Sequence, residues 1–307
     1  MSGLRLAAEQ YLRMRRALGY KLAVQGHHLR NFVSHLEATD ASTVTIEHAV
    51  AWATCAGTDA TYWGDRLSVA RQFARHLQLT DAACEVPPAR LLPVRRRRAI
   101  PYLYEPEEIT ALMQAAGKLK RPPHPATCQT LIGLLAVTGM RVGEALALDR
   151  DDVDPRHGLL RIIDSKFGKS REVAVDASVI DALDAYGRLR DRHLPHPRSE
   201  AFFLSTAGTR LFRSCVDRTF ARLVKTVGLQ PRSPGCRPRL HDFRHSFAVR
   251  TLLDWHAAGV DVQARLPTLS TYLGHVSPAT TYYYLSAAPE LLALVAKRLE
   301  PTEGAAS

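Results

Sequence analysis

Residues 138–148 read T-G-M-R-V-G-E-A-L-A-L, and this stretch decides how the second half of the chain is interpreted. The preceding residues, 128–137, have an apolar helical pattern, and Gly139 can end that helix because glycine adopts a left-handed backbone at little cost. Arg141 then falls near the start of the next helix, where unpaired N–H groups and the helix dipole favour an anion. Arg141 could therefore grip an anionic group, or it could simply pair with Glu144 one turn on.

Two further motifs add side chains that suit phosphate chemistry. The motif H-D-F-R-H-S-F-A begins at His241 and places Arg244 three residues on, so that both side chains face the same way on a helix. The motif L-G-H ends at His275, and T-T-Y-Y-Y follows it and ends at Tyr284. Arginines can hold phosphate oxygens, histidines can donate hydrogen bonds or move protons, and a tyrosine can attack phosphorus.

A lysine between two short apolar runs is the remaining candidate. The runs, residues 159–163 and 172–175, are rich in β-branched side chains and predict strands. Residues 164–171 include Gly168 and several polar residues and suit a hairpin tip, from which a lysine can reach a leaving oxygen and protonate it. Lys166 and Lys169 both lie in this tip.

Together these segments resemble the tyrosine recombinases, the phage-integrase family of enzymes that cut and rejoin DNA. The resemblance is strong over residues 100–290, because three motifs occur in the family's order at plausible separations. It implies attack by a tyrosine on a DNA phosphodiester, which gives a 3′-phosphotyrosyl link and a free 5′ hydroxyl. Neither ATP, a metal ion nor another cofactor is required. The implied catalytic set is Arg141, Lys166, His241, Arg244, His275 and Tyr284.

Two members of this set have a neighbour that competes for the role. The family's spacing from the first arginine favours Lys166, but Phe167 stands where a glycine is common, so Lys169 remains the alternative. The spacing from the L-G-H motif favours Tyr284 as the nucleophile, with Tyr283 next. Consecutive residues of a helix point about 100° apart, so only one of these tyrosines can attack.

No metal site is expected from the sequence. His241 and His245 form an i, i+4 pair, but the glutamate of H-E-x-x-H is missing and Arg244 between them would repel a cation. We therefore expect His245 to be structural. The cysteines are five in number, widely spaced and without a C-x-x-C pair, so neither a disulfide framework nor a zinc finger is predicted.

The charge balance points to a polyanionic partner. The chain has 307 residues, 41 lysines plus arginines and a formal net charge of +11, which fits binding to double-stranded DNA. No apolar run approaches the length of a membrane span, and no secretory leader is recognisable. We expect a cytoplasmic, nucleoid-associated protein in a reducing compartment.

The chain is expected to be mainly α-helical with a small β-hairpin or sheet. Residues 1–84 predict a bundle of four short helices, a core-type DNA-binding domain. Residues 105–307 predict an α+β catalytic domain with a terminal helix at 289–300. Further helices are expected at 107–119, 178–192, 212–227, 242–258 and 266–273. The resemblance implies that the two domains close around DNA as a C-shaped clamp.

Residues 85–104 are expected to link the two domains. Prolines discourage a helix there, and four consecutive arginines could contact phosphates or form a solvated face. Because a basic linker can cross the duplex backbone, we expect DNA contacts from Arg95, Arg96, Arg97 and Arg98.

The terminal helix bears on assembly. Its apolar stripe of Leu291, Leu292, Val295 and Leu299 must be buried, either in its own domain or, as the family commonly does, on a neighbouring subunit. We expect a homotetramer on two DNA sites, and a monomer or weak oligomer without DNA.

Two other functions fit parts of the pattern. A type IB topoisomerase has similar active-site chemistry but relaxes supercoils as a monomer, so sequence-specific recombinant products would separate the two. A catalytically idle DNA-binding accessory factor would form no covalent complex on a nicked substrate. The sequence does not distinguish a transposase of a mobile element from other recombinases.

Overall fold

The computed structural model of the protein describes residues 3–55, 57, 60–92, 99–164 and 168–275. By their internal contacts the residues form two compact units, Met1–Arg98 and Ala99–Ser307. Several predicted features lie outside the described residues: Arg95, Arg96, Arg97, Arg98, Lys166, Tyr284 and the terminal helix at 289–300.

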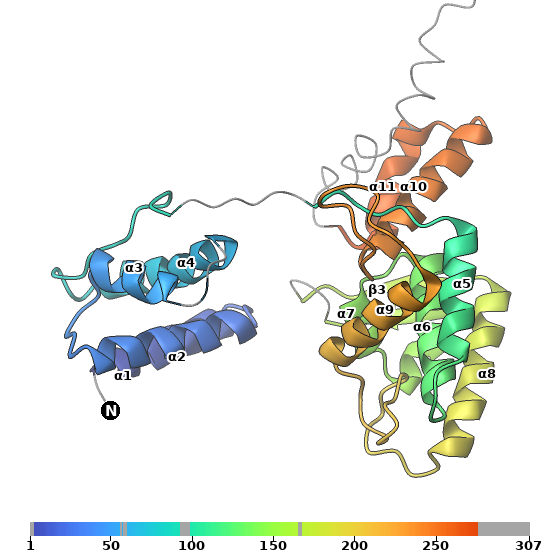
Figure 1. The fold of residues 1–307 in the computed structure, drawn as a ribbon, viewed down its shortest axis with the longest axis horizontal. Coiled ribbons are helices and arrows are strands. Elements are labelled where there is room, and N and C mark those ends of the chain that lie inside the picture. Colours follow the sequence, from blue (N-terminus) through green and yellow to red (C-terminus); the bar gives the residue numbers. More distant parts are fainter. Residues whose placement is uncertain (1–2, 56, 58–59, 93–98, 165–167, 276–307) are drawn as a thin grey trace, which may run out of the picture. The chain divides into compact units, whose positions relative to one another are not determined.

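The first unit contains four α-helices in its described part, as the sequence predicted. They are α1 (Gly3–Ala17), α2 (Ala23–Ala38), α3 (Ile46–Thr54) and α4 (Ala60–Leu77) (Figure 1). The two apolar faces recognised in the sequence are both buried: Leu29, Phe32, Val33 and Leu36 on α2, and Leu67, Ala70, Phe73, Ala74 and Leu77 on α4. Helical periodicity therefore identified the core of this unit.

A positively charged side chain, that of Arg66, is buried in this small core. The guanidinium of Arg66 lies 4.0 Å from the ring centroid of Trp52, and its Nη2 donates a hydrogen bond to the Trp52 carbonyl. Ring electrons and a carbonyl oxygen both compensate the positive charge. The bundle thus includes a basic side chain that is unavailable to an external partner.

Both ends of the segment predicted as a linker pack onto the units. Cys84 is buried in the core of the first unit, and Val86 packs against it. Tyr102 and Tyr104 belong to the core of the second unit, where the Tyr104 ring stacks on Phe243 at 4.4 Å. The expected linker 85–104 is therefore shortened at both ends, because its aromatic and apolar side chains gain more from burial than from exposure.

The second unit is built around α6 (His124–Thr138). This helix packs against α5 (Pro106–Gly117), α8 (Ala177–His193) and α10 (Asp242–Ala257). The short α7 (Val142–Ala147) follows it, α9 (Arg213–Val227) packs on α5 and α7, and α11 (Val262–Leu273) lies beside α10 (Figure 1). Because α6 touches helices on several sides, most of its surface is apolar, and its sequence shows no single polar face.

A three-stranded antiparallel sheet interrupts the helices. Its strands are β1 (Val153–Asp154), β2 (Leu159–Ile162) and β3 (Arg171–Ala174), in the order β1-β2-β3. The hairpin of β2 and β3 was predicted, and Ile162 pairs with Arg171 next to its tip. Strand β1 was missed, because two residues are too few to show an alternating pattern.

The N-terminus of α11 was predicted four residues too late. The expected helix began at Leu266, but Asp261 caps the observed helix by accepting hydrogen bonds from the N–H groups of Gln263 and Ala264. Pro267 lies inside the helix. The capping aspartate marks the start of the helix.

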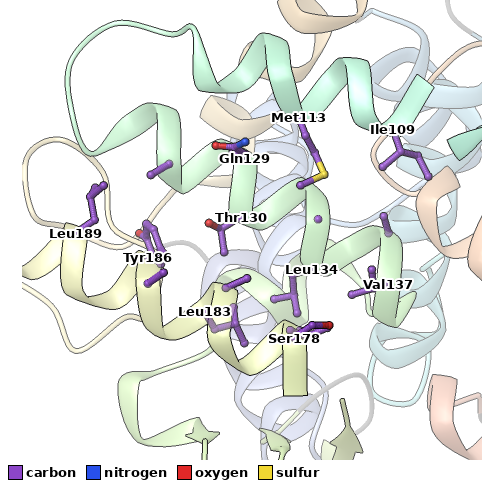
Figure 2. A pocket seen from close by; sticks show the side chains of 16 residues that line it. Ile109, Met113, Gln129, Thr130, Leu134, Val137, Ser178, Leu183, Tyr186 and Leu189 are labelled. Atoms are coloured by element: carbon purple, nitrogen blue, oxygen red, sulfur yellow. The ribbon is translucent and has the colours of Figure 1, made fainter. Parts of the chain in front are cut away.

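An open apolar groove of about 510 Å³ runs along α5, α6 and α8 (Figure 2). Met113, Leu134 and Leu183 line it, and Val137 and Leu189 are among the exposed apolar residues of the unit. This face of α6 therefore presents an apolar surface that the described residues leave open.

Within the described ranges, none of the helices combines the length and the apolar character that a membrane span requires.

Candidate active site

The turn between α6 and α7 brings Arg141 into position. Gly139 ends α6 in the left-handed conformation, with φ of 59°, as the sequence predicted. A Cβ atom at this glycine would lie 2.5 Å from Cδ1 of Phe247 on α10, so only glycine allows the two helices to approach this closely. The turn ends at Arg141, which is the N-cap of α7.

Arg141 does pair with Glu144. Its Nη1 donates a hydrogen bond to Oε1 of Glu144 at 2.6 Å, and its backbone N–H donates to Oε2 at 3.0 Å. Its Nη2 donates to the carbonyl of Gly274 at 2.8 Å. The side chain keeps 25% of its surface exposed, whereas that of Glu144 keeps 5%. The ion pair thus orients a guanidinium that still faces solvent, so pairing and phosphate binding are compatible.

Arg244 on α10 is held by two helix ends. Its Nη1 donates a hydrogen bond to the carbonyl of Gly139 at 3.0 Å, and its Nη2 donates to the carbonyl of Leu273 at 2.6 Å. The residue is only 2% exposed. Carbonyls at the C-terminal ends of α6 and α11 therefore fix this cation, where the helix dipoles favour positive charge.

The start of α10 is anchored beside the site. Asp242 is fully buried and accepts two hydrogen bonds from Arg239, each at 2.9 Å. Phe243 is buried against Tyr104, and the hydroxyl of Ser246 accepts a hydrogen bond from the Tyr104 N–H. These contacts fix the first turn of α10 and hence the directions of His241 and Arg244.

His275 follows the left-handed Gly274 at the end of α11, and its N–H donates a hydrogen bond to the carbonyl of Ser270 at 2.9 Å. Burial, together with the charges of Arg244, Arg141 and Arg171, lowers the pKa of His275 to about 3. A neutral ring is therefore the form present at physiological pH.

His241 feels the same positive charges. Desolvation by the surrounding protein, together with the charges of Arg244 and Arg141, lowers the pKa of His241 to about 4, although the residue is exposed at the surface. The charges of both arginines favour the neutral ring whatever the degree of burial. Arg141, His241, Arg244 and His275, predicted from three separate motifs, thus lie within one electrostatic neighbourhood.

The neutral state of His275 can be observed directly in the free protein. With its pKa near 3, the ring should show no titration between pH 8 and pH 5, whereas an ordinary histidine titrates near 6.5. The measurement is an NMR titration of ¹³C-labelled histidine rings, in which the His275→Gln variant identifies the resonance by its absence. A midpoint between pH 6 and pH 7 for that resonance would contradict the arrangement.

Sequence reasoning missed Arg171. Its guanidinium pairs with Glu144, Nη2 to Oε2 at 2.8 Å and Nη1 to Oε1 at 3.2 Å, and its Nε donates to the carbonyl of Tyr272 at 2.9 Å. A signal was available: side chains alternate along β3, so Arg171 shares the face of the buried Val173. An arginine on the inner face of a strand needs a buried partner.

His245 lies beside the site. Its ring meets that of His241 edge-on at 5.1 Å, and its Nε2 is 3.9 Å from Oδ1 of Asp242. Across the described ranges, no three histidine, cysteine or carboxylate side chains are grouped as a metal ion would need. These contacts fit the structural role expected for His245.

Comparisons with known proteins bear on the identity of the chain. The model of the phage integrase family matches residues 103–290, which contain all three motifs. The chain belongs to the phage integrase family. Its members cut and rejoin DNA, so this recombinase is an enzyme of DNA strand breakage and rejoining.

Relatives and solved structures agree with the family. The recombinase is 41% identical to the putative integrase/recombinase y4rB of Sinorhizobium fredii, over 98% of each chain. It is 29% identical to the tyrosine recombinase XerC of Mycobacterium leprae, over 89% of this chain and 90% of XerC. The XerH site-specific recombinase in a post-cleavage complex with difH DNA matches in fold, with a TM-score of 0.61 at 19% identity. That match covers 83% of this chain and 72% of XerH.

Proposed function

We propose that Arg141 and Arg244 bind the scissile phosphate of DNA, with His241 and His275 as neutral hydrogen-bonding and proton-transfer groups. Three guanidinium groups and the single carboxylate of Glu144 give the cluster a net charge of two positive. A pentacovalent phosphorane carries more negative charge than the phosphodiester from which it forms, so such a cluster stabilises the transition state more than the substrate.

In the proposed reaction, the phenolic oxygen of Tyr284 attacks phosphorus and the bond to the 5′ oxygen breaks. A neutral histidine ring accepts the phenolic proton, and Lys166 gives a proton to the leaving 5′ oxygen. The ester formed with Tyr284 conserves the energy of the phosphodiester bond. Attack by the 5′ hydroxyl of a partner strand then reverses these steps and joins the exchanged strand.

The main support for this proposal is that the predicted arginines, Arg141 and Arg244, bind carbonyls at the same end of α11. Arg244 and Arg141 donate to the successive carbonyls of Leu273 and Gly274, immediately before His275. The two arginines come from motifs far apart in the sequence, yet both lie at this one site. Guanidinium groups suit the oxygens of a phosphate, so their meeting here supports phosphate as the ligand.

The proposal is tested on the DNA that the protein selects. Sequencing of crosslinked DNA gives the site, from which a duplex with a nick next to the scissile phosphate is made. The nick lets the short 3′ fragment diffuse away, so covalent protein–DNA should accumulate, and intact duplexes should yield recombinants joined at the site. If the protein instead relaxed a supercoiled plasmid and formed no recombinants, it would be a topoisomerase.

The role of Lys166 as the general acid makes a specific prediction. Lys166→Ala should slow cleavage strongly on ordinary DNA, but act at near the wild-type rate when sulfur replaces the 5′-bridging oxygen, because a thiolate leaves without a proton. Cleavage of both substrates is measured under single-turnover conditions, with Lys169→Ala as the matched variant. Rescue confined to Lys169→Ala would move the role to that residue.

The four linker arginines are proposed to bind DNA phosphates without reading sequence. Replacing Arg95, Arg96, Arg97 and Arg98 together by alanine should weaken binding to all sequences alike. It should also reduce the slope of log K against log salt by about 0.9 for each phosphate that the variant no longer neutralises. Fluorescence anisotropy over a series of salt concentrations measures the slope, and an unchanged slope would mean that the arginines are solvated.

We propose that exchange takes four copies on two duplexes, in the DNA-containing cytoplasm of the cell. Four strands are broken and rejoined in a complete exchange, which requires four nucleophiles. The apolar stripe at residues 289–299, outside the described residues, is proposed to bind a neighbouring copy. Light scattering should give a monomer or weak oligomer without DNA and a four-copy complex with two duplexes, whereas a persistent monomer on DNA would contradict this.

A further inference from the structure

Three successive carbonyls at the end of α11 each accept a hydrogen bond from a different arginine. Those of Leu273 and Gly274 accept from Arg244 and Arg141, and that of Tyr272 accepts from Nε of Arg171 at 2.9 Å. The last turn of a helix leaves its carbonyls without partners in the helix, so they are acceptors for cations. Arg171 therefore holds the same turn as the two proposed phosphate ligands.

Arg171 is turned toward the protein, unlike Arg141. Its Nη1 and Nη2 both meet Glu144 and its Nε meets Tyr272, so each of its three nitrogens contacts a protein oxygen. This geometry suits a residue that fixes its neighbours rather than one that binds phosphate.

Through Glu144, Arg171 constrains Arg141. Oε1 of Glu144 accepts from Nη1 of both arginines, and Oε2 accepts from Nη2 of Arg171 and from the Arg141 backbone. Burial alone would raise the pKa of Glu144, but hydrogen bonds and charges from Arg171 and Arg141 outweigh it and lower the pKa. The carboxylate is thus kept charged and fixed between the two guanidinium groups.

Arg171 also sets the path of the chain into His275. A Cβ atom on Gly274 would lie 2.7 Å from Nη1 and 2.8 Å from Cζ of Arg171, so the guanidinium packs directly against the glycine backbone. This close approach, together with the positive φ of 67°, explains the glycine of the L-G-H motif. Any displacement of Arg171 would shift the turn that carries His275.

Finally, Arg171 is the first residue of β3, paired with Ile162 at the base of the hairpin that contains Lys166. We infer that Arg171 is a positioning residue, which fixes the Arg141–Glu144 pair, the turn before His275 and the hairpin base in one arrangement. The inference rests on the proposed function of that site. A lysine cannot replace it, because one ammonium group cannot meet a carboxylate in fork geometry and a carbonyl at the same time.

The test compares Arg171→Lys and Arg171→Gln with the wild type on the nicked substrate. Single-turnover cleavage at saturating protein should slow by roughly 10- to 100-fold in both variants, since small misplacements of reacting groups have effects of this size. The dissociation constant for DNA and its salt slope should stay within about twofold, because Arg171 is not a phosphate ligand. Arg188→Lys, an exposed arginine of α8, is the matched control and should cleave at the wild-type rate.

A double-mutant cycle tests the route through the carboxylate. If Arg171 acts through Glu144, the combination of Arg171→Gln with Glu144→Gln should cleave no more slowly than Glu144→Gln alone. If the two substitutions instead reduced the cleavage rate by the product of their separate factors, Arg171 would not act through Glu144. Full cleavage by Arg171→Lys, or a loss of DNA affinity as large as the loss of rate, would overturn the inference. A wild-type protein that forms no adduct would instead contradict the proposed function.

Discussion

The Tyr284→Phe variant is expected to form no covalent adduct with DNA while binding the same DNA with nearly unchanged affinity. The substitution removes one phenolic oxygen, which is the proposed nucleophile, and leaves the charged surface intact. Denaturing gel electrophoresis of the protein with the nicked substrate detects the adduct, and fluorescence anisotropy measures the affinity.

Tyr283→Phe is the matched control, since it removes the same atom one residue earlier and should leave the adduct in place. An adduct in Tyr284→Phe together with its loss in Tyr283→Phe would show that the nucleophile is Tyr283. Adducts in both variants would show that Tyr284 is not the sole nucleophile.

Arg244→Ala is expected to slow cleavage by about 100-fold or more, the size of effect seen when a transition-state donor is removed. The guanidinium bridges the carbonyls of Gly139 and Leu273, so the variant also loses the tie between α6 and α11. Arg244→Lys separates charge from geometry, because its single ammonium keeps the charge without the two-carbonyl bridge.

We expect Arg244→Lys to be slow as well, with DNA affinity close to that of the wild type. Cleavage is compared at saturating protein, and thermal unfolding is followed for each variant to show that it is folded. If affinity fell while the rate at saturating protein stayed at the wild-type value, Arg244 would contribute to ground-state binding only and not specifically to the transition state.

The sequence predicted those parts of the site that lie in short motifs. His241 and Arg244 lie at the start of the same helix, and the glycines at 139 and 274 occupy positive-φ turns that favour glycine, so local patterns were sufficient to recognise these positions. Long amphipathic helices such as α2 and α4 were recognised for the same reason, since their apolar faces repeat with the helical period.

The partners of Arg171 could not be predicted, because they depend on contacts between segments far apart in the sequence. Its partners Glu144 and Tyr272 come from α7 and α11, and no spacing rule relates a strand residue to a helix end so distant along the chain. The end of the predicted linker at residue 104 was placed too late for a similar reason. Tyr102 and Tyr104 are buried because they pack into the core around Phe243, a residue far away in the sequence.

The arrangement also shows how a cluster of like charges is stabilised. Arg141, Arg171 and Arg244 would repel one another, but Glu144 and the carbonyl end of α11 lie among them. The positive charge is thus assembled during folding rather than on DNA binding, and two histidines stay neutral beside it. A pre-organised cation cluster of this kind needs little rearrangement when charge develops on the phosphate.

The central claim, that this recombinase cuts DNA through a tyrosyl ester at Tyr284, is tested most directly by mapping the adduct. The covalent complex from the nicked substrate is digested with protease and nuclease, and the modified peptide is sequenced by mass spectrometry. We predict a nucleotide attached through a 3′-phosphate to Tyr284. A nucleotide on another residue, or one attached through its 5′-phosphate, would contradict the account.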